Sequence, residues 1–496
     1  MCAIAGIFGE DISKDLKDIL ISLKHRGPDG SGLFIDGEVL HGEIKQMDFP
    51  EGSVGLGHNL LSIVGCQSSQ PIIEDNQVLV CNGEIYNFRE IKEELNEEFT
   101  TDSDCEVILK LNNSFEGENL LSSIRKTMQK LDGDYAFALW DGQNLVLGRD
   151  PVGVKPLYYG EIKGKIKAFA SEKKALWKIG IMEVHTLPPG HIRLNDQLIS
   201  VEELPLNGSP PYQKDPESKT FNLQQIDAEL LKRDLKHALI RSVEKRITGL
   251  ENVGLIFSGG VDSTILACIL KNLPVKTTLY TVGSENSQDL GYALKAAEIL
   301  NLDIRTQIVT EDVVKYNLEP VLSAIEEFNV MKIGVGMPTY LAAKMAKEDH
   351  QKVVLTGQGA DELFAGYNRY LMDYSQKGED TQDVLKKDIA NIYHVNLQRD
   401  DAVTMAHGVE LRVPFLDREV IKAAFNIPFK YKILDENDKI RKHMLRQVAV
   451  DLGVPEFIAQ RPKKAAQYGS GINKILIKKV LKDFNQESYM KKLRGF

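Results

Sequence analysis

The chain has 496 residues, enough for two to four domains that each bury a core of their own. Its 71 acidic and 61 basic side chains give a net charge of −10, which argues against a broad nucleic-acid-binding surface. Five cysteines without a CxxC spacing argue against a disulfide framework, and no apolar run is long enough to cross a membrane. We therefore expect a soluble, cytoplasmic protein without nucleic-acid or membrane partners.

Short strand-like runs separated by Gly, Asn and Asp fill the first 200 residues. They lie at 2–9, 54–65, 77–87, 134–142, 144–150 and 168–171, with helix-like stretches at 88–99 and 105–115. This pattern predicts an α+β layered domain built on antiparallel sheets. A stretch rich in Pro, Gly and Ser follows, so we divide the chain into a first domain, a linker and a second domain at 1–203, 204–222 and 223–496.

Beyond the linker, helix-like and strand-like segments alternate. Residues 227–247 carry apolar side chains at a spacing of four, which is typical of an amphipathic helix. Strand-like runs at 253–257, 276–282, 303–309 and 352–356 then alternate with helix-like runs at 263–273 and 290–301. The alternation predicts an α/β, Rossmann-like domain with a parallel sheet, and we expect the chain from about 365 onward to be mostly helical.

The string VGLIFSGGVDST at 253–264 has the features of an anion-binding loop. A strand ends at Phe257, the glycines Gly259 and Gly260 let the backbone approach a ligand, and a helix starts near Ser263. Asp262 offers a carboxylate suited to Mg²⁺ that is also held by phosphate oxygens. The plain alternative is a glycine-rich turn that an aspartate caps.

A second glycine-containing loop, VVLTGQGADELFAGY at 353–367, carries the adjacent acids Asp361 and Glu362. Such a pair can hold metal and pyrophosphate or bind a substrate ammonium, and a solvated helix start is the alternative. Arg412 and Lys463 add cations further along the chain. Cations near a phosphoryl or acyl-phosphate centre offset the negative charge that develops in the transition state.

Cys2, directly behind the initiator methionine, is a small core residue or a nucleophile. If Met1 is removed, Cys2 carries both a thiol and a free α-amine. An α-amine titrates near pH 8, so it is a suitable general base for its own thiol. Four sequence motifs bear on the nucleophile interpretation. They are MCAIAGIFG at 1–9, KHRGPDGSG at 24–32, CNGEIYNF at 81–88 and TDSDCE at 101–106.

These four strings resemble the glutaminase domain of class II glutamine amidotransferases, which are N-terminal-nucleophile hydrolases. SGGVDS resembles the PP-loop of ATP pyrophosphatases. In their order, with GADE, VPFLD and RPKK following, the motifs make the whole chain similar to the glutamine-hydrolysing asparagine synthetase family. The resemblance implies a carbon–nitrogen ligase that uses ATP and Mg²⁺, takes ammonia from glutamine through an internal channel, and amidates aspartate through β-aspartyl-AMP. It also implies a homodimer.

The resemblance assigns a role to each matched residue. The residues implied for catalysis are Cys2, Asn82, Gly83, Gln358 and Lys463. Those implied for glutamine binding are Leu60, Ile63, Val64, Asn82, Gly83, Glu84 and Asp104. Those implied for ATP are Ile256, Ser258, Gly259, Gly260, Asp262, Ser263, Thr264, Val282, Thr356 and Gly357. Those implied for aspartate or pyrophosphate are Asp361, Glu362, Arg412 and Lys463, and the implied Mg²⁺ ligands are Asp262 and Asp361.

The sequence departs from the family pattern at three positions. Leu60 stands where the family carries the arginine that grips the glutamine α-carboxylate, and Gly65 stands where it carries an aspartate. Loss of such a charge-assisted contact costs about 2 to 5 kcal/mol of binding. Gln358 replaces an acid and cannot act as a base near neutral pH. Two alternatives therefore stay open: the same chemistry on another carboxylate, as in β-lactam synthetases, and a non-catalytic nitrogen-sensing relative.

Overall fold

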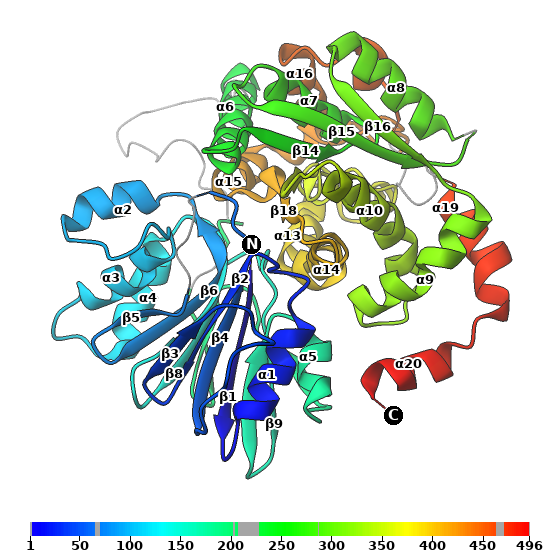
Figure 1. The fold of residues 1–496 in the computed structure, drawn as a ribbon. Coiled ribbons are helices and arrows are strands. Elements are labelled where there is room, and N and C mark those ends of the chain that lie inside the picture. The colour runs from blue at the N-terminus through cyan, green and yellow to red at the C-terminus, as the bar shows by residue number, and fades with distance from the viewer. Residues whose placement is uncertain are drawn as a thin grey trace, which may run out of the picture.

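The protein folds into two halves, an N-terminal half (2–201) and a C-terminal half (228–495), which lie against each other (Figure 1). The computed structural model describes residues 2–64, 70–201, 204–206, 228–285, 287–462 and 471–495. The predicted linker at 204–222 lies outside the described residues except for 204–206. Gly65 and Lys463 also lie outside them.

Two antiparallel sheets form the centre of the N-terminal half. The first has the order β11-β9-β10-β1-β4-β2-β3 and the second the order β13-β12-β8-β7-β6-β5. The strands of the first sheet are β1 (Ala3–Gly9), β2 (Gly30–Ile35), β3 (Glu38–His41), β4 (Val54–Leu60), β9 (Tyr158–Ile162), β10 (Ile166–Ala170) and β11 (Val184–Thr186). Those of the second are β5 (Ile72–Glu74), β6 (Gln77–Ile85), β7 (Gly133–Trp140), β8 (Leu145–Arg149), β12 (His191–Leu194) and β13 (Gln197–Ser200).

The two sheets pack face to face between outer layers of helices, as the sequence predicted. Apolar side chains that alternate along the strands, such as Ile4 on β1 and Val80 on β6, fill the space between the sheets. Helices α1 (Ser13–Ser22) and α5 (Lys173–Lys178) cover the outer face of the first sheet. The second sheet is covered by α2 (Phe88–Leu95), α3 (Glu106–Asn113) and α4 (Leu120–Lys130).

A five-stranded parallel sheet with the order β16-β15-β14-β17-β18 organises the C-terminal half and confirms the predicted α/β fold. Its strands are β14 (Asn252–Ile256), β15 (Lys276–Gly283), β16 (Asp303–Ile308), β17 (Val353–Leu355) and β18 (Glu410–Arg412). Figure 1 shows α7 and α8 on one side of this sheet and α10 on the other. The edge strand β18, which lies in a segment predicted to be helical, borders the N-terminal half.

Helices make up most of the remaining C-terminal half, as predicted. They are α6 (Ala228–Ile247), α7 (Val261–Lys271), α8 (Gln288–Leu300), α9 (Glu311–Ile325), α10 (Val330–Glu348), α11 (Ala360–Leu363), α12 (Arg369–Lys377), α13 (Thr381–Ile392), α14 (Gln398–Met405), α15 (Arg418–Asn426), α16 (His443–Asp451), α17 (Glu456–Ala459), α19 (Ile472–Ile475) and α20 (Gln486–Arg494). A π-helical turn at Tyr393–Leu397 joins α13 to α14. Within the described residues, no helix is both long and apolar enough to cross a membrane.

A buried carboxylate organises the turn that follows β8. Asp150 Oδ1 accepts hydrogen bonds from the backbone N–H groups of Val152 (3.0 Å), Gly153 (2.6 Å) and Val154 (3.0 Å). Asp150 Oδ2 accepts from the N–H of Lys155 at 3.1 Å. Burial nevertheless raises the pKa of Asp150 to about 6.

We expect Asp150 to make stability depend on pH. The folded protein binds this proton more tightly than the unfolded chain, in which an aspartate titrates near pH 3.9. The stabilisation is complete below about pH 4, and about 3 kcal/mol of it is lost as the pH rises through 6. Urea unfolding of the wild type and of Asp150→Asn checks this. The unfolding free energy of the wild type minus that of the variant should decline between about pH 4 and pH 6 and then level off. A difference that is constant over this range contradicts the assignment.

Candidate active sites

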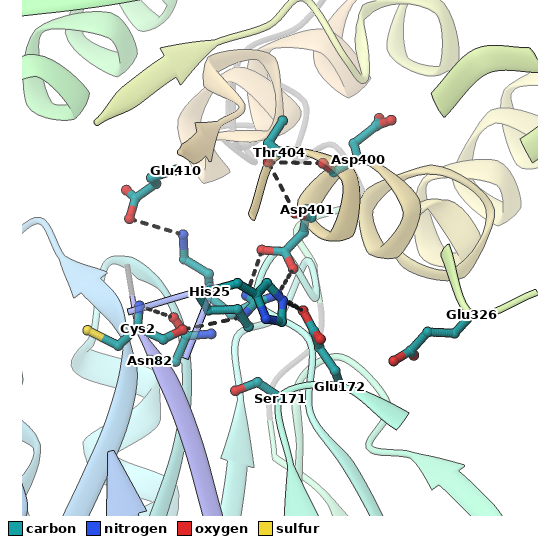
Figure 2. A network of polar contacts seen from close by, with 12 residues as sticks. Cys2, His25, Asn82, Ser171, Glu172, Glu326, Asp400, Asp401, Thr404 and Glu410 are labelled. Atoms are coloured by element: carbon teal, nitrogen blue, oxygen red, sulfur yellow. Dashed lines mark hydrogen bonds and ion pairs between the residues drawn. The ribbon is translucent and has the colours of Figure 1, made fainter. Parts of the chain in front are cut away.

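Cys2 and Asn82 bring the two N-terminal sheets together at the edge that faces the C-terminal half (Figure 2). Cys2 is buried directly before β1, and its backbone N–H donates to Asn82 Oδ1 at 3.0 Å. The contact directs the other atom of the amide, Asn82 Nδ2, away from Cys2 N. Asn82 Nδ2 is buried, and no other group in the described part of the chain accepts its hydrogens. A donor in this position is suited to an oxygen of a bound ligand.

The Cys2 thiol needs help to ionise. Burial raises its pKa to about 11. The thiol is therefore protonated near neutral pH, and attack by sulfur requires a base close by. Gly83, which follows Asn82 on β6, leaves no room for a side chain, because a Cβ there would lie 2.7 Å from the Tyr135 Cβ.

The two acids predicted to bind glutamine, Glu84 and Asp104, lie near this centre. Burial raises the pKa of Glu84 to about 7 and also raises that of Asp104, which accepts a hydrogen bond from the Ile85 N–H at 2.6 Å. Glu84 Oε1 lies 2.9 Å from Arg412 Nη2. Arg412 thus lies beside the predicted glutamine site, paired with Glu84 and Glu410, and the structure does not place it in the phosphate cavity where we expected it.

The segment after β4, predicted to bind glutamine, meets a cation from the other half. Ser62 donates its N–H to Asp29 Oδ2 at 2.9 Å. Lys352 Nζ lies 2.8 Å from the same carboxylate oxygen and 2.6 Å from the Ser62 carbonyl oxygen. Leu60 ends β4 and is partly buried, whereas Val64 is 47% exposed. Lys352 therefore supplies positive charge to the loop that follows Leu60.

A buried ion-pair network joins the two halves around Arg26. The guanidinium is fully buried and contacts both Asp401 oxygens, at 2.8 and 3.2 Å, and Glu172 Oε1 at 3.1 Å. Its Nε also lies 3.5 Å from the Cys2 carbonyl oxygen. Although burial opposes ionisation, His25 and Arg26 help to hold the pKa of Glu172 well below its usual range. Figure 2 shows Asp401 and Glu410 reaching from the C-terminal half toward Cys2 and Glu172.

The phosphate-type loop lies between β14 and α7, where the sequence predicts it. Gly259 has a φ of +64°, and a Cβ on it would lie 2.6 Å from the Ala293 nitrogen, so glycine is required at this position. The Thr264 hydroxyl donates to the Gly260 carbonyl oxygen at 2.8 Å, so this hydroxyl is bonded to the backbone at the start of α7. Arg461 holds the loop from outside, with its Nη1 3.1 Å from the Gly259 carbonyl oxygen.

A cavity of about 1000 Å³ opens beside this loop. It gathers residues from β14, β15, the loop after β17 and the π-helical turn at Tyr393–Leu397. The predicted residues that line it are Ile256, Ser258, Asp262, Ser263, Val282, Thr356, Gly357, Gln358, Asp361 and Glu362. Gly259, Gly260 and Thr264 lie next to its wall without lining it. Such a size and polar lining suit a nucleotide together with a small acceptor.

The two predicted Mg²⁺ ligands share one ammonium group. Lys442 Nζ lies 2.8 Å from both Asp262 oxygens and 2.6 Å from Asp361 Oδ1, and Lys442 is fully buried. The two carboxylates thus converge on one point of the cavity wall. This donor set fits Mg²⁺, which takes one or two protein carboxylates and completes its shell with phosphate oxygens and water. No cluster of three or more His, Cys, Asp or Glu suited to a metal occurs among the described residues.

Glu362 is the second buried acid of the cavity. Its Oε1 accepts hydrogen bonds from the Tyr367 hydroxyl and from Asn396 Nδ2, both at 2.9 Å. Its Oε2 is buried without a hydrogen-bond donor from the described part of the protein. Burial and the neighbouring Asp361 raise the pKa of Glu362 to about 7. One oxygen of Glu362 is therefore held by two donors, and the other can accept a hydrogen bond from a ligand in the cavity that Gln358 also lines.

Comparison with known proteins agrees with this geometry. A family model described as a glutamine amidotransferase domain matches residues 1–190, and one described as asparagine synthase matches 234–382 and 373–492. A Methanocaldococcus jannaschii protein named Putative asparagine synthetase (glutamine-hydrolyzing) 1 is 42% identical over 96% of this chain and 95% of its own length. The rat asparagine synthetase (glutamine-hydrolyzing) is 29% identical, over 98% of this chain and 87% of its own.

The chain belongs to the glutamine-hydrolysing asparagine synthetases.

Within this synthetase family, the two candidate sites are parts of one protein. The amidotransferase match contains Cys2 and Asn82, and the synthase match contains Asp262 and Asp361 together with Lys442. The family resemblance read from the sequence motifs is thus confirmed.

Three charged residues of the synthetase escaped the sequence analysis. Arg26 lies inside the string KHRGPDGSG, but the string alone does not show that Arg26 pairs with an acid 375 positions away. Lys352 begins the strand-like run at 352–356, and Lys442 stands in a polar segment without a periodic pattern. Their partners come from distant parts of the chain, so only the folded structure reveals them.

We expect Arg26→Met to destabilise the synthetase strongly. The substitution leaves Asp401 and Glu172 buried without their shared cation, which costs about 3 to 5 kcal/mol. Urea unfolding measures the loss. Lys167→Met is the control, because Lys167 pairs with Asp196 at the surface and a pair of this kind contributes about 0 to 1 kcal/mol. Equal effects of the two substitutions contradict the importance of burial.

Proposed function

We propose that the chain forms asparagine from aspartate, with ATP as the activating substrate and glutamine as the source of nitrogen. The observation that carries this proposal is the presence, in one chain, of a buried cysteine beside an open amide donor and a polar nucleotide-sized cavity. The relatives named as glutamine-hydrolysing asparagine synthetases support it, because they match over nearly the whole chain.

In the N-terminal half, the Cys2 sulfur attacks the side-chain amide carbon of glutamine. Once Met1 has been removed, the α-amine of Cys2 takes the thiol proton and passes it to the leaving nitrogen. Asn82 Nδ2 and the Gly83 N–H donate to the oxygen that becomes negative in the tetrahedral intermediate. Ammonia leaves, and water then hydrolyses the thioester to glutamate. Glu84 and Asp104 bind the substrate ammonium, so Arg412 and this ammonium share Glu84.

In the C-terminal half, an oxygen of the aspartate β-carboxylate attacks the α-phosphorus of ATP and releases pyrophosphate. Ile256 and Val282 border the adenine, and the loop at 258–264 faces the phosphates. Lys463, which lies outside the described residues, is the proposed cation near the acyl phosphate. Asp262 and Asp361 are suited to Mg²⁺, which would neutralise phosphate charge when bound.

Ammonia then attacks the activated carbonyl carbon, and AMP leaves. We place its route between the halves, along a small cavity of about 20 Å³ that Arg26, Glu172 and Asp401 line. A space of this size holds about one water molecule or one ammonia molecule. Lys332 and Arg399 line both this cavity and the large one, which supports a continuous path.

We expect Cys2→Ala to separate the two activities. Without the thiol, glutamine-dependent asparagine formation should fall by about 10³-fold or more, because the covalent step is lost. Formation from added ammonia should stay within about threefold of the wild-type rate, since the C-terminal half does not use Cys2. Chromatographic measurement of asparagine with each nitrogen donor checks this.

Two controls sharpen the test. Cys268→Ala, which removes a buried thiol of α7, should keep both activities. Release of pyrophosphate with a panel of amino-acid carboxylates, in the presence of ammonia, identifies the acceptor. The proposed function fails if aspartate gives no pyrophosphate, and the division of labour fails if Cys2→Ala abolishes both activities equally.

A further inference from the structure

The turn that precedes α16 has an unusual backbone. Arg441 and Lys442 both have positive φ angles, of 56° and 57°. L-residues enter this region at a steric cost and normally do so singly. Two such residues in succession persist only where the surrounding structure fixes them, and such positions cluster at functional sites. The second of them is Lys442, which bridges Asp262 and Asp361.

One carboxylate fixes this turn. Asp438 is buried, and its Oδ1 accepts the N–H groups of Ile440 and Arg441 at 2.9 and 3.0 Å. Its Oδ2 accepts the Leu434 N–H at 3.1 Å and contacts His443 Nε2 at 2.7 Å. Asp438 thereby holds the residues on both sides of Lys442.

The far side of the turn is fixed by the loop that follows α11. Arg441 Nε donates to the Gly366 carbonyl oxygen at 3.0 Å. A Cβ on Gly366 would lie 2.0 Å from Asp361 Oδ1 and 2.2 Å from the Lys442 Cε. Only glycine at position 366 lets the lysine approach Asp361, so the placement of Lys442 depends on two separate features.

The electrostatics explain why the lysine must be placed so closely. Asp262 and Asp361 alone would repel the anionic oxygens of a polyphosphate at this part of the cavity. Lys442 is fully buried behind the two acids, which line the cavity, and its ammonium offsets this repulsion. A lysine on a mobile backbone would lose conformational entropy when it pairs with the two acids, whereas the backbone of a fixed turn has lost that entropy beforehand.

We propose that Asp438 is a positioning residue, which fixes the turn at residues 441–443 so that the Lys442 ammonium is held between Asp262 and Asp361, the two acids that line the cavity. The proposal rests on the proposed function for the reaction. Asp438 acts through Lys442 and does not itself touch the substrate.

A double-mutant cycle tests this inference with aspartate, ATP and ammonia. Lys442→Met should lower the kcat of pyrophosphate release by about 10²-fold, and Asp438→Ala by about 10- to 100-fold, with a smaller change in the KM for ATP. The variant that combines both should be no slower than Lys442→Met, because Asp438 acts only through the lysine. Asp438→Asn should retain most of kcat, since its side-chain oxygen can still accept the N–H groups of the turn.

Asp435→Ala is the matched control, because Asp435 lies exposed in the same loop and should leave kcat unchanged. Glutamine hydrolysis by Cys2, in the other half, confirms that each variant is folded. Two results overturn the inference: a normal kcat for Asp438→Ala or Lys442→Met, or a combined variant that loses the product of the two single losses.

The affinity for pyrophosphate with Mg²⁺, measured by calorimetry, separates this inference from the proposed function. Asp438→Ala should weaken binding in the wild-type background and leave it unchanged in the Lys442→Met background. If the wild type releases no pyrophosphate with aspartate, the proposed function fails. The pyrophosphate affinities of the four proteins still test whether Asp438 acts through Lys442. Equal affinities of the wild type and Asp438→Ala overturn the positioning role.

Discussion

Buried charge between the two halves is the constraint on which the rest of the structure depends. Arg26 of the N-terminal half meets Asp401, and Arg412 of the C-terminal half meets Glu84. Removal of one partner from such a pair leaves an uncompensated buried charge, which is far more costly than the pair itself. The two halves are therefore held in one relative position, because any displacement would expose or orphan several of these groups at once.

Strand β18 shows how this constraint links the two candidate sites. The Arg412 side chain reaches Glu84, while its backbone carbonyl oxygen accepts the N–H of Thr356 at 3.1 Å, in the wall of the large cavity. Glu410, two residues earlier, pairs with the same guanidinium and lies 3.8 Å from Lys155 of the N-terminal half. One three-residue strand thus contacts both the predicted glutamine site and the wall of the nucleotide cavity.

The local sequence pattern predicted those elements whose structure depends on neighbouring residues. The alternation around β14, α7 and β15 predicted a parallel sheet, and the string at 253–264 predicted the strand, loop and helix that the structure has there. β18 escaped prediction because a strand of three residues carries almost no periodic signal.

The roles of charged residues were harder to predict, because they depend on partners far along the chain. Arg412 was expected at the phosphates, yet its guanidinium pairs with Glu84, and the cation that joins Asp262 to Asp361 is Lys442. A cationic residue type indicates that an anion is near, but not which anion the fold will bring within reach.

Transfer of ammonia inside the protein is the central claim, and an isotope experiment tests it most directly. The wild type would convert aspartate and ATP in the presence of glutamine labelled with ¹⁵N at the amide and a large excess of unlabelled ammonium, and mass spectrometry would read the asparagine amide. Our account predicts that the amide carries predominantly ¹⁵N, because the nitrogen moves between the buried sites without entering bulk solvent. An amide diluted to the isotope ratio of the bulk ammonium would contradict it.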